Sequence, residues 1–254
     1  MIDTRRDFDG CSALVTGAGS GIGAACAETL AARGASRLFL NDIKPDGLDQ
    51  LSLGDCEVVP VIGSVADPEL WAKLEPDLAG LDHAIVNAGI GAGGALTELD
   101  LAAWRRVMDV NLDGAFLTLS TAMRAMRETG GSAVVVSSTT ALKPVPGIGP
   151  YGVSKAAAAH MARIAAVEGA AQGIRVNAIA PGGVDTAIWE SSQDFQRSVE
   201  AHGREATLSA MAKTTPSGRF ATAAEMAETI LFLLSDAAAN VTGHVMVSDG
   251  GYTL

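Results

Sequence analysis

Ala13–Gly23, which reads ALVTGAGSGIG, decides the fold, because in it a short apolar run leads directly into a glycine-rich turn. The apolar run Ala13–Thr16 predicts a buried strand, and the alanine-rich segment after the turn predicts a helix. Gly17 and Gly21 permit a tight turn and a close approach of the main chain to an anion, and Gly23 permits close packing where the helix starts. Since a helix N-terminus offers unpaired N–H groups, the stretch predicts a diphosphate-binding site, with a purely structural turn as the alternative.

The same alternation of strand and helix patterns continues along the chain. Short runs that are nearly all apolar alternate with longer alanine-rich stretches, which is typical of a parallel sheet covered by helices on both faces. We therefore predict the α/β class: one domain over residues 1–254, with a doubly wound parallel sheet of about seven strands and helices on both faces, of the Rossmann type. The predicted strands are Ala13–Thr16, Arg37–Asn41, Glu57–Ile62, His83–Asn87, Ala133–Ser137, Arg175–Ala180 and Val245–Val247, and the predicted helices are Ile22–Arg33, Pro68–Ala79, Leu101–Asp109, Asp113–Thr129, Gly152–Gln172 and Ala223–Ser235.

The segment Trp189–Pro216 interrupts this alternation. It is polar and partly helical in pattern, and it lies between the sixth predicted strand and the helix before the seventh. Long excursions of this kind in compact domains often cover active sites. We expect a substrate lid at about 189–216, with a solvated surface hairpin as the alternative.

The composition argues against several classes of protein. Of the 254 residues, 48% are hydrophobic and 19% are charged, which is enough for one sizeable core and unlike a disordered or fibrous chain. Asp and Glu number 29 against 18 Lys and Arg, and the formal net charge of -11 disfavours nucleic acid and anionic membrane surfaces as partners.

The cysteines and the N-terminus bear on the cellular compartment. Cys11, Cys26 and Cys56 form no C-x-x-C pair and have no nearby His, so we expect neither a disulfide framework nor a metal site. A reducing, cytoplasmic location fits this use of cysteine. The charged start Met1–Gly10 is unlike a signal peptide, and no apolar run approaches the roughly 18 residues that a membrane-spanning helix needs.

A carboxylate follows the second predicted strand. Asp42 stands 19 positions after Gly23, where it can accept hydrogen bonds from both hydroxyls of an adenosine ribose and would repel the additional phosphate of NADP. The glycine-rich turn contains no Arg or Lys to pair with that phosphate, although Lys44 lies two residues beyond Asp42. The sequence therefore favours NAD, and an ordinary turn residue beside Pro45 and Gly47 is the alternative for Asp42.

Tyr151 and Lys155 are four positions apart at the start of a long alanine-rich stretch. In a helix this spacing puts the phenol and the ammonium on one face. A free phenol has a pKa near 10, and we expect the neighbouring ammonium to lower it. A pair with this spacing is also common on helix surfaces, but Tyr151 is one of only two tyrosines in this chain.

Polar side chains also follow two other predicted strands. Ser138 comes just after the fifth strand, at the sheet edge where parallel α/β sheets bind ligands. Asn87 closes the fourth strand, and Asn111 lies between two predicted helices, with a simple helix cap as its alternative role. We expect the three side chains to lie near the same edge.

Together these motifs resemble the short-chain dehydrogenase/reductase family. Their serial order and spacing agree with that family over nearly the whole chain. The motifs that carry the resemblance are Thr16–Gly23, Asn87–Gly89, Asn111, Ser138, Tyr151 with Lys155, Pro181–Thr186 and Asp249–Gly251.

The resemblance implies a role for each of four polar side chains. Tyr151 would be the catalytic acid/base, Lys155 would bind the nicotinamide ribose and lower the pKa of Tyr151, and Ser138 would hold the substrate oxygen. Asn111 would anchor a water that relays protons from Lys155 to solvent. The implied cofactor-binding residues are Gly17, Ser20, Gly21, Ile22, Gly23, Asp42, Ser64, Val65, Asn87, Ala88, Gly89, Tyr151, Lys155, Pro181, Gly182, Val184 and Thr186.

The chain departs from the family pattern at two places. Many relatives carry an acidic residue before a Val after the third strand, where this chain has Ser64 before Val65, so adenine binding would rest on main-chain contacts and the Ser64 hydroxyl. The usual Asn-Asn-Ala-Gly run reads Val86–Gly89, which keeps the second Asn.

The implied activity is hydride transfer between NAD and a secondary alcohol or ketone. The alternatives are an NADPH-dependent carbonyl reductase of the 3-oxoacyl type and a non-catalytic NAD-binding sensor. The candidate pocket is mostly apolar or small, which favours a small or cyclic, weakly polar substrate, and we expect its exception, Lys143, to be a solvated loop lysine. The candidate pocket residues are Ile90–Gly94, Thr139–Val145, Gly183, Ile188 and Trp189.

The resemblance also implies a partner. Family members often pair through the helices that correspond to Asp113–Thr129 and Gly152–Gln172, so we expect a homo-oligomer, either a tetramer or a dimer.

Overall fold

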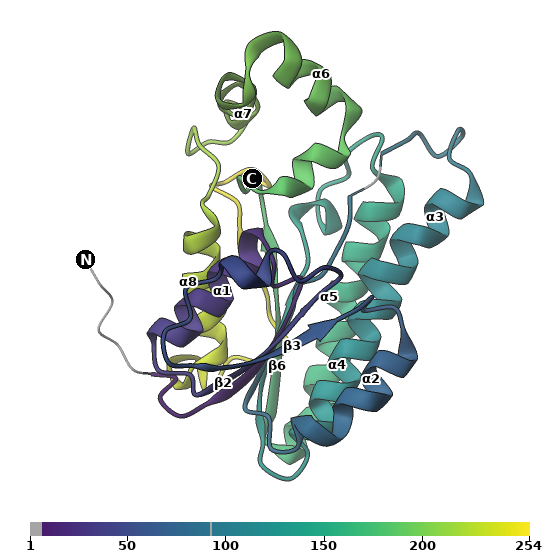
Figure 1. The fold of residues 1–254 in the computed structure, drawn as a ribbon. Helices are drawn as coiled ribbons and strands as arrows, with labels where there is room; N and C mark the ends of the chain where they lie inside the picture. Colours follow the sequence, from purple (N-terminus) through teal and green to yellow (C-terminus); the bar gives the residue numbers. More distant parts are fainter. Residues whose placement is uncertain (1–6, 92) are drawn as a thin grey trace.

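The computed structural model describes residues 7–91 and 93–254. Over these residues the chain forms a seven-stranded sheet with strand order β3-β2-β1-β4-β5-β6-β7, and all neighbouring strands are parallel. Figure 1 shows α1 and α8 on one side of the sheet and α2, α4 and α5 on the other. The strand order reverses between β1 and β4, and ligands bind at the carboxyl ends of the strands beside such a reversal. The predicted doubly wound α/β fold is confirmed.

The elements lie close to their predicted positions. One boundary matters for the site, because the helix that carries Tyr151 begins at Gly149, before the predicted start at Gly152. The strands are Ser12–Thr16 (β1), Arg37–Asp42 (β2), Glu57–Ile62 (β3), His83–Val86 (β4), Gly131–Val136 (β5), Ile174–Pro181 (β6) and Val245–Ser248 (β7). The helices are Gly21–Ala32 (α1), Pro68–Leu74 (α2), Leu101–Met108 (α3), Gly114–Ala125 (α4), Gly149–Gly169 (α5), Gln193–His202 (α6), Arg204–Ala212 (α7) and Ala223–Leu234 (α8).

The sheet separates two apolar cores. Successive side chains of a strand point to opposite faces, so Leu14 lies in the core that includes Leu119 of α4, whereas Val15 lies in the core that includes Leu30 of α1. All four side chains are almost completely buried. Because both faces of β1 are covered, the strand holds the following glycine-rich turn at a fixed place on the sheet edge.

The chain between α3 and α4 differs from the prediction. Instead of a break between two helices, Asp109–Asp113 forms a π-helical turn that joins α3 to α4. Asn111 lies inside this turn and is 1% exposed, so its alternative role as a simple helix cap is wrong. π-Helical turns within helices are often found at functional sites, because the extra residue redirects a side chain.

The excursion Trp189–Pro216 contains α6 and α7, preceded by a 3-10 turn at Ala187–Ser191. In Figure 1 both helices stand apart from the two helical layers, at the end of the molecule where the C-terminus also lies. Arg204, the first residue of α7, pairs with Asp185 at 2.6 Å and with Glu190 at 3.6 Å. The excursion is thereby tied back to the segment that directly follows β6.

The remaining expectations concern a membrane-spanning helix, a metal site and the cysteines. Within residues 7–91 and 93–254, no helix combines the length and the apolar character needed to cross a membrane, and no three His, Cys, Asp or Glu side chains are grouped to hold a metal ion. The three cysteines are free thiols. The expectations for Met1–Gly10 and for the pocket segment Ile90–Gly94 include residues 1–6 and 92, which lie outside the described residues.

Candidate active site

The glycines of the turn stand where a Cβ would be strained or crowded. Gly17 and Gly21 have φ angles of +64° and +54°, which residues with a Cβ rarely adopt. A Cβ on Gly17 would lie 3.0 Å from the Cα of Ala88, and a Cβ on Gly23 would overlap the carbonyl oxygen of Gly17. The turn therefore exposes main chain at the start of α1, which fits a bound diphosphate.

Thr16 and Asn87 brace this turn. Thr16 Oγ1 accepts hydrogen bonds from the main-chain N–H groups of Asn87 at 3.0 Å and Ala88 at 3.1 Å. In return, Asn87 Nδ2 donates to the carbonyl oxygens of Thr16 at 2.9 Å and Gly17 at 3.2 Å. The Asn87 amide thus holds the turn in shape, a function that the sequence motif did not reveal, and the bracing role of the Thr16 hydroxyl was also missed.

Asp42 lies beside the glycine-rich turn. Its Oδ2 accepts a hydrogen bond from the N–H of Gly19 at 2.9 Å, and its Oδ1 accepts one from the N–H of Ile43 at 2.7 Å. Each carboxylate oxygen has a second lone pair, so Asp42 keeps capacity to accept hydrogen bonds from a ligand. A Cβ on Gly47 would overlap the carbonyl oxygen of Gly19, so the loop after β2 also packs directly on the turn.

The segment after β3 contributes mainly through its backbone. Ser64 Oγ accepts a hydrogen bond from the N–H of Ala66 at 3.2 Å. The Val65 side chain is 5% exposed and lies in the apolar core, where it leaves no room for a Cβ on Gly114. A ligand at this edge would therefore meet the main chain of Val65, while the Ser64 hydroxyl keeps a proton to donate.

Ser138 and Tyr151 meet at the carboxyl end of β5. Ser138 Oγ accepts a hydrogen bond from the N–H of Thr140 at 3.2 Å, which fixes the Ser138 side chain at the start of a 3-10 turn. Burial raises the pKa of Tyr151, and a hydrogen bond with Ser138 opposes part of that shift. The net direction is upward, so the expectation from sequence that the ammonium of Lys155 sets a lowered pKa is wrong for the protein alone; desolvation dominates.

Lys155 is 4% exposed and follows Tyr151 by about one turn of α5. Its Nζ donates to the carbonyl oxygen of Val136 at 2.8 Å and lies 5.8 Å from the centroid of the Tyr151 ring. Burial lowers the pKa of Lys155 from 10.5 to about 8. Ser137, which sequence analysis did not single out, donates from Oγ to the carbonyl oxygen of Lys155 at 2.8 Å and so ties α5 to the end of β5.

Asn111 joins three parts of the site. Its Oδ1 accepts from the N–H of Ile90 at 2.8 Å, and its Nδ2 donates to the Ile90 carbonyl at 3.0 Å and to Ser154 Oγ at 3.2 Å. A Cβ on Gly89 would be 3.3 Å from both Asn111 Oδ1 and Lys155 Nζ, so these two groups face the same point. Asn111 thus holds the loop after β4 against α5 beside Lys155.

The segment Pro181–Thr186 lies between the glycine-rich turn and β7. A Cβ on Gly21 would be 3.1 Å from Thr186 Cγ2, so Thr186 lies against the turn. The N–H of Gly182 donates to the carbonyl of Ser248 at 3.0 Å. The structure therefore brings the end of β6 to the same edge as the glycine-rich turn and Asp42.

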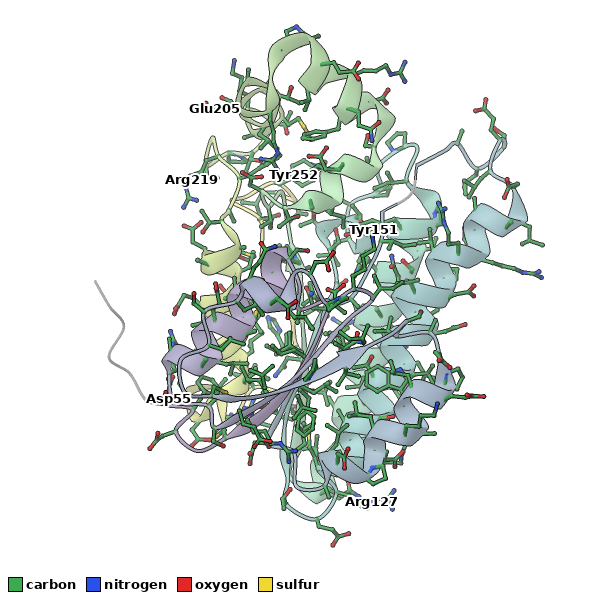
Figure 2. The ribbon with its side chains drawn as sticks, viewed as in Figure 1. Asp55, Arg127, Tyr151, Glu205, Arg219 and Tyr252 are labelled. Atoms are coloured by element: carbon green, nitrogen blue, oxygen red, sulfur yellow. The ribbon has the colours of Figure 1, made fainter. Side chains whose placement is uncertain are left out.

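Lys143 differs from its expected place. It is not a solvated loop lysine, because its Nζ donates to the carbonyl oxygen of Tyr252 at 2.7 Å and lies 4.2 Å from the centroid of the Tyr252 ring. Figure 2 shows Tyr151 and Tyr252 in the region between the sheet and the α6–α7 excursion. Lys143 thus fastens the C-terminal segment to the loop that follows Ser138.

Two partly open cavities lie apart from these side chains. One cavity of about 200 Å³ lies behind Gly183, between the end of β7 and the start of α8, and another of about 150 Å³ lies against α5 near His160. Neither is lined by Ser138, Tyr151 or Lys155. The site is therefore identified by its hydrogen-bonding geometry at the open edge of the sheet.

Comparisons with known proteins agree with this geometry. Residues 17–253 match the family model described as "Enoyl-(Acyl carrier protein) reductase". The chain is 41% identical to cis-4-hydroxycyclohexanecarboxylate dehydrogenase of Sinomonas cyclohexanicum over 95% of this chain and 96% of that protein. It is 37% identical to the L-tagatose-forming galactitol 2-dehydrogenase of Cereibacter sphaeroides over the full length of both.

Solved structures give the same result. Levodione reductase superimposes with a TM-score of 0.87 and 32% identity over 97% of this chain and 98% of that chain. A short-chain type dehydrogenase/reductase from Mycobacterium marinum superimposes with a TM-score of 0.84 and 31% identity over 97% of each chain. The chain is an oxidoreductase that uses a nicotinamide cofactor on a secondary alcohol or ketone, and it belongs to the short-chain dehydrogenase/reductase family.

Proposed function

We propose that this protein transfers a hydride between NAD and a small or cyclic, weakly polar secondary alcohol or its ketone. The observation that carries the proposal is the meeting of Ser138, Tyr151 and Lys155 at the sheet edge beside the glycine-rich turn. A sensor that only binds NAD has no need of a phenol held by a serine above a buried lysine, so the geometry favours an enzyme.

The proposed roles follow from the contacts. The nicotinamide ring supplies the carbon that accepts or donates the hydride. Tyr151 removes the hydroxyl proton of the alcohol, and Ser138 donates a hydrogen bond to the same oxygen as negative charge develops on it. Burial raises the pKa of Tyr151, so its deprotonation requires positive charge near the phenol. We assign part of that charge to Lys155, whose Nζ lies 5.8 Å from the centroid of the Tyr151 ring. Asn111 keeps the loop after β4 beside Lys155, at the place where a proton path to solvent would begin.

The preference for NAD rests on Asp42. Its carboxylate lies against Gly19, so the additional phosphate of NADP would have to approach a fixed negative charge. We expect Asp42→Ala to change the ratio of kcat/KM for NAD to that for NADP by at least about tenfold in favour of NADP. Asp42→Asn keeps an oxygen for the Gly19 N–H and removes only the charge, so it should show the same change.

Asp46→Asn, on the exposed part of the same loop, is the matched control and should leave the cofactor ratio within about twofold. Steady-state rates with both cofactors measure the effect. An unchanged ratio in both Asp42 variants would show that this carboxylate does not select the cofactor.

The substrate class rests on the rim of the site and on the relatives. Leu142, Val145 and Ile188 all expose at least 36% of their surface. They come from the candidate pocket, and such a rim suits an apolar ring better than a phosphorylated chain. Relatives that are 41% and 35% identical are named for a hydroxycyclohexanecarboxylate and for a cyclohexadiene diol, whereas galactitol and D-threitol appear in the names of others. A cyclic secondary alcohol is therefore our first candidate.

An oxidation screen tests the function. Purified protein is mixed with NAD or NADP and with cyclic secondary alcohols, linear polyols or a 3-hydroxyacyl thioester, and reduced cofactor is followed by absorbance. We expect the highest kcat/KM with NAD and a cyclic alcohol. A preference for NADP and the thioester would establish the 3-oxoacyl-type reductase instead, and NAD binding without turnover of any alcohol would favour the sensor.

Three wider expectations belong to the same proposal. We propose one domain whose excursion at about 189–216 covers the substrate, a cytoplasmic location in keeping with the free thiols, and a homo-oligomer, tetramer or dimer. Support for the oligomer comes from exposed apolar side chains on α4 and α5, which are Phe116, Val153, Ile164 and Val167.

A further inference from the structure

The chain directly after β6 is held in place by the residues that follow the excursion. The N–H of Ala221 donates to the Gly183 carbonyl at 3.0 Å, and the N–H of Asp185 donates to the Ala221 carbonyl at 3.3 Å. These bonds form a short parallel bridge between Val184 and Ala221. The backbone of Pro181–Thr186, the segment proposed to hold the nicotinamide, is therefore held in position by Ala221.

The ring of Phe220 fills the space that a side chain at position 183 would need. A Cβ built on Gly183 would overlap three carbons of this ring. On the lid side, Phe220 stacks on Trp189 with ring centroids 5.6 Å apart and an interplanar angle of 7°. Trp189 Nε1 in turn donates to the Val184 carbonyl at 2.7 Å. One ring thus contacts both the nicotinamide segment and the first turn of the excursion.

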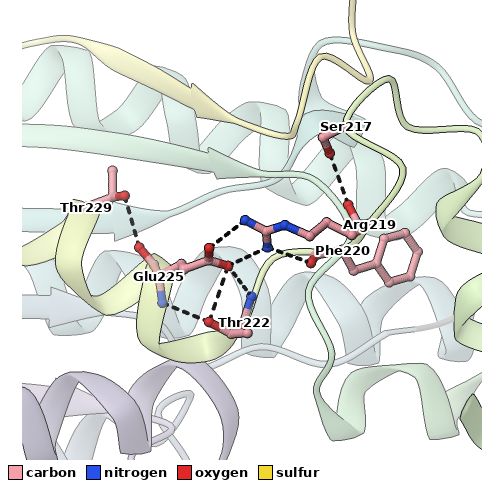
Figure 3. Close-up of polar contacts among 6 residues, drawn as sticks. All are labelled: Ser217, Arg219, Phe220, Thr222, Glu225 and Thr229. Carbon is pink, nitrogen blue, oxygen red and sulfur yellow. Dashed lines mark hydrogen bonds and ion pairs between the residues drawn. The ribbon is translucent and has the colours of Figure 1, made fainter. Parts of the chain in front are cut away.

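Phe220 itself is fixed to the body of the protein. Figure 3 shows Arg219 in a two-point pair with Glu225, at 2.8 and 2.6 Å, and donating to the Phe220 carbonyl at 3.2 Å. Glu225 also accepts from the N–H of Thr222 at 2.9 Å, which closes a capping box at the start of α8. Because the other side of α8 is buried in the core, these bonds anchor the main chain of Phe220 to the body of the protein, while its ring lies between Gly183 and Trp189.

We propose that Phe220 is a positioning residue for hydride transfer, acting through Gly183, Val184 and Trp189 on the placement of the nicotinamide ring. The inference rests on the proposed function. It predicts that the contact between Gly183 and Phe220 controls the position of the nicotinamide half of the cofactor. Binding of the adenosine half at the glycine-rich turn and Asp42 should not depend on this contact. Misplacement of a reacting group by about 1 Å can lower a rate by roughly 10²-fold, so the expected effect is large.

Two single variants and their combination test this contact. Gly183→Ala should lower both the affinity for NADH and kcat by at least about tenfold, while the affinity for ADP-ribose, which lacks nicotinamide, should stay within about twofold. Phe220→Ala should lower kcat without changing ADP-ribose binding. The double variant Gly183→Ala/Phe220→Ala, in which the overlap is gone, should bind NADH at least about fivefold more tightly than Gly183→Ala alone.

Binding of ADP-ribose shows that each variant is folded, and Phe220→Leu provides a smaller change of the same contact. Phe232→Leu, on the exposed face of α8, is the matched control and should leave NADH binding and kcat within about twofold. Equal losses for ADP-ribose and NADH, or a double variant no better than Gly183→Ala, would overturn the role of Phe220. If the wild-type protein binds ADP-ribose and NADH but oxidises no alcohol, the proposed function is wrong. If the wild type oxidises an alcohol and the Phe220 variants do so at the same rate, only the role of Phe220 is wrong.

Discussion

Tyr151→Phe is expected to lower kcat for alcohol oxidation by at least about 10²-fold and by up to about 10⁴-fold, the usual range for removal of a general acid or base. The substitution removes one oxygen, which shares a hydrogen bond with Ser138, and keeps the ring that packs over Lys155. Affinity for NADH should change little, because the phenol oxygen contributes to chemistry more than to binding. Single-turnover rates and NADH titration measure the two quantities separately.

Tyr252→Phe is the matched control. Tyr252 is the other tyrosine of the chain, and its contacts with Lys143 involve its carbonyl oxygen and its ring rather than its hydroxyl. We expect the kcat of Tyr252→Phe to remain within about twofold of the wild-type value. Near-normal turnover by Tyr151→Phe would remove Tyr151 from the mechanism.

Lys155→Met is expected to lower kcat and to change the pH profile on its alkaline side. The variant loses the positive charge that favours the Tyr151 phenolate, so the rise of alcohol oxidation with pH should move to higher pH. It also loses the titration of Lys155 itself, whose pKa of about 8 falls in the range where such profiles are measured. A profile of kcat/KM that keeps its shape and position in the variant would refute the coupling between the two side chains.

Stability provides a second readout for Lys155 that does not depend on activity. Its pKa is about 8 in the folded protein against 10.5 ordinarily, so between these two pH values the unfolded chain binds more protons than the folded chain. The free energy of unfolding of the wild type should therefore rise with pH across this window, by roughly 3 kcal/mol from this group. Lys155→Met should lack that rise in denaturant titrations at matched pH values.

The order of motifs along the chain was enough to predict the sheet and the place of the site. Nearly all-apolar runs such as Val134–Val136 are compatible with burial on both faces, and a glycine-rich turn after the first of them marks the edge where ligands bind. The side chains at that edge follow from chain direction, because every carboxyl end of a parallel sheet lies on the same side. Ser138 and Asn87 were thus expected at this edge, and the resemblance to the family added Tyr151, which shares a hydrogen bond with Ser138.

Local sequence patterns could not predict the contacts between segments that are far apart along the chain. Thr16 and Asn87 are 71 positions apart, and their exchange of hydrogen bonds depends on β1 and β4 being neighbours in the sheet. Lys143 was expected to be a solvated loop lysine, yet the C-terminal segment, 109 positions further along the chain, returns to accept its hydrogen bond. The π-helical turn at Asn111 was missed because its extra residue leaves no mark in composition.

By itself, the sequence determined the α/β fold and the family, and it supplied the side chains that we propose to react, since each of these depends on residue types in a fixed order and spacing along the chain. Only the tertiary structure decided how those side chains are charged and held. Burial raises the pKa of Tyr151 and lowers that of Lys155, and Phe220 comes to lie against Gly183 across 37 positions of chain. Desolvation and packing depend on every neighbour in space, and no local pattern along the chain records them.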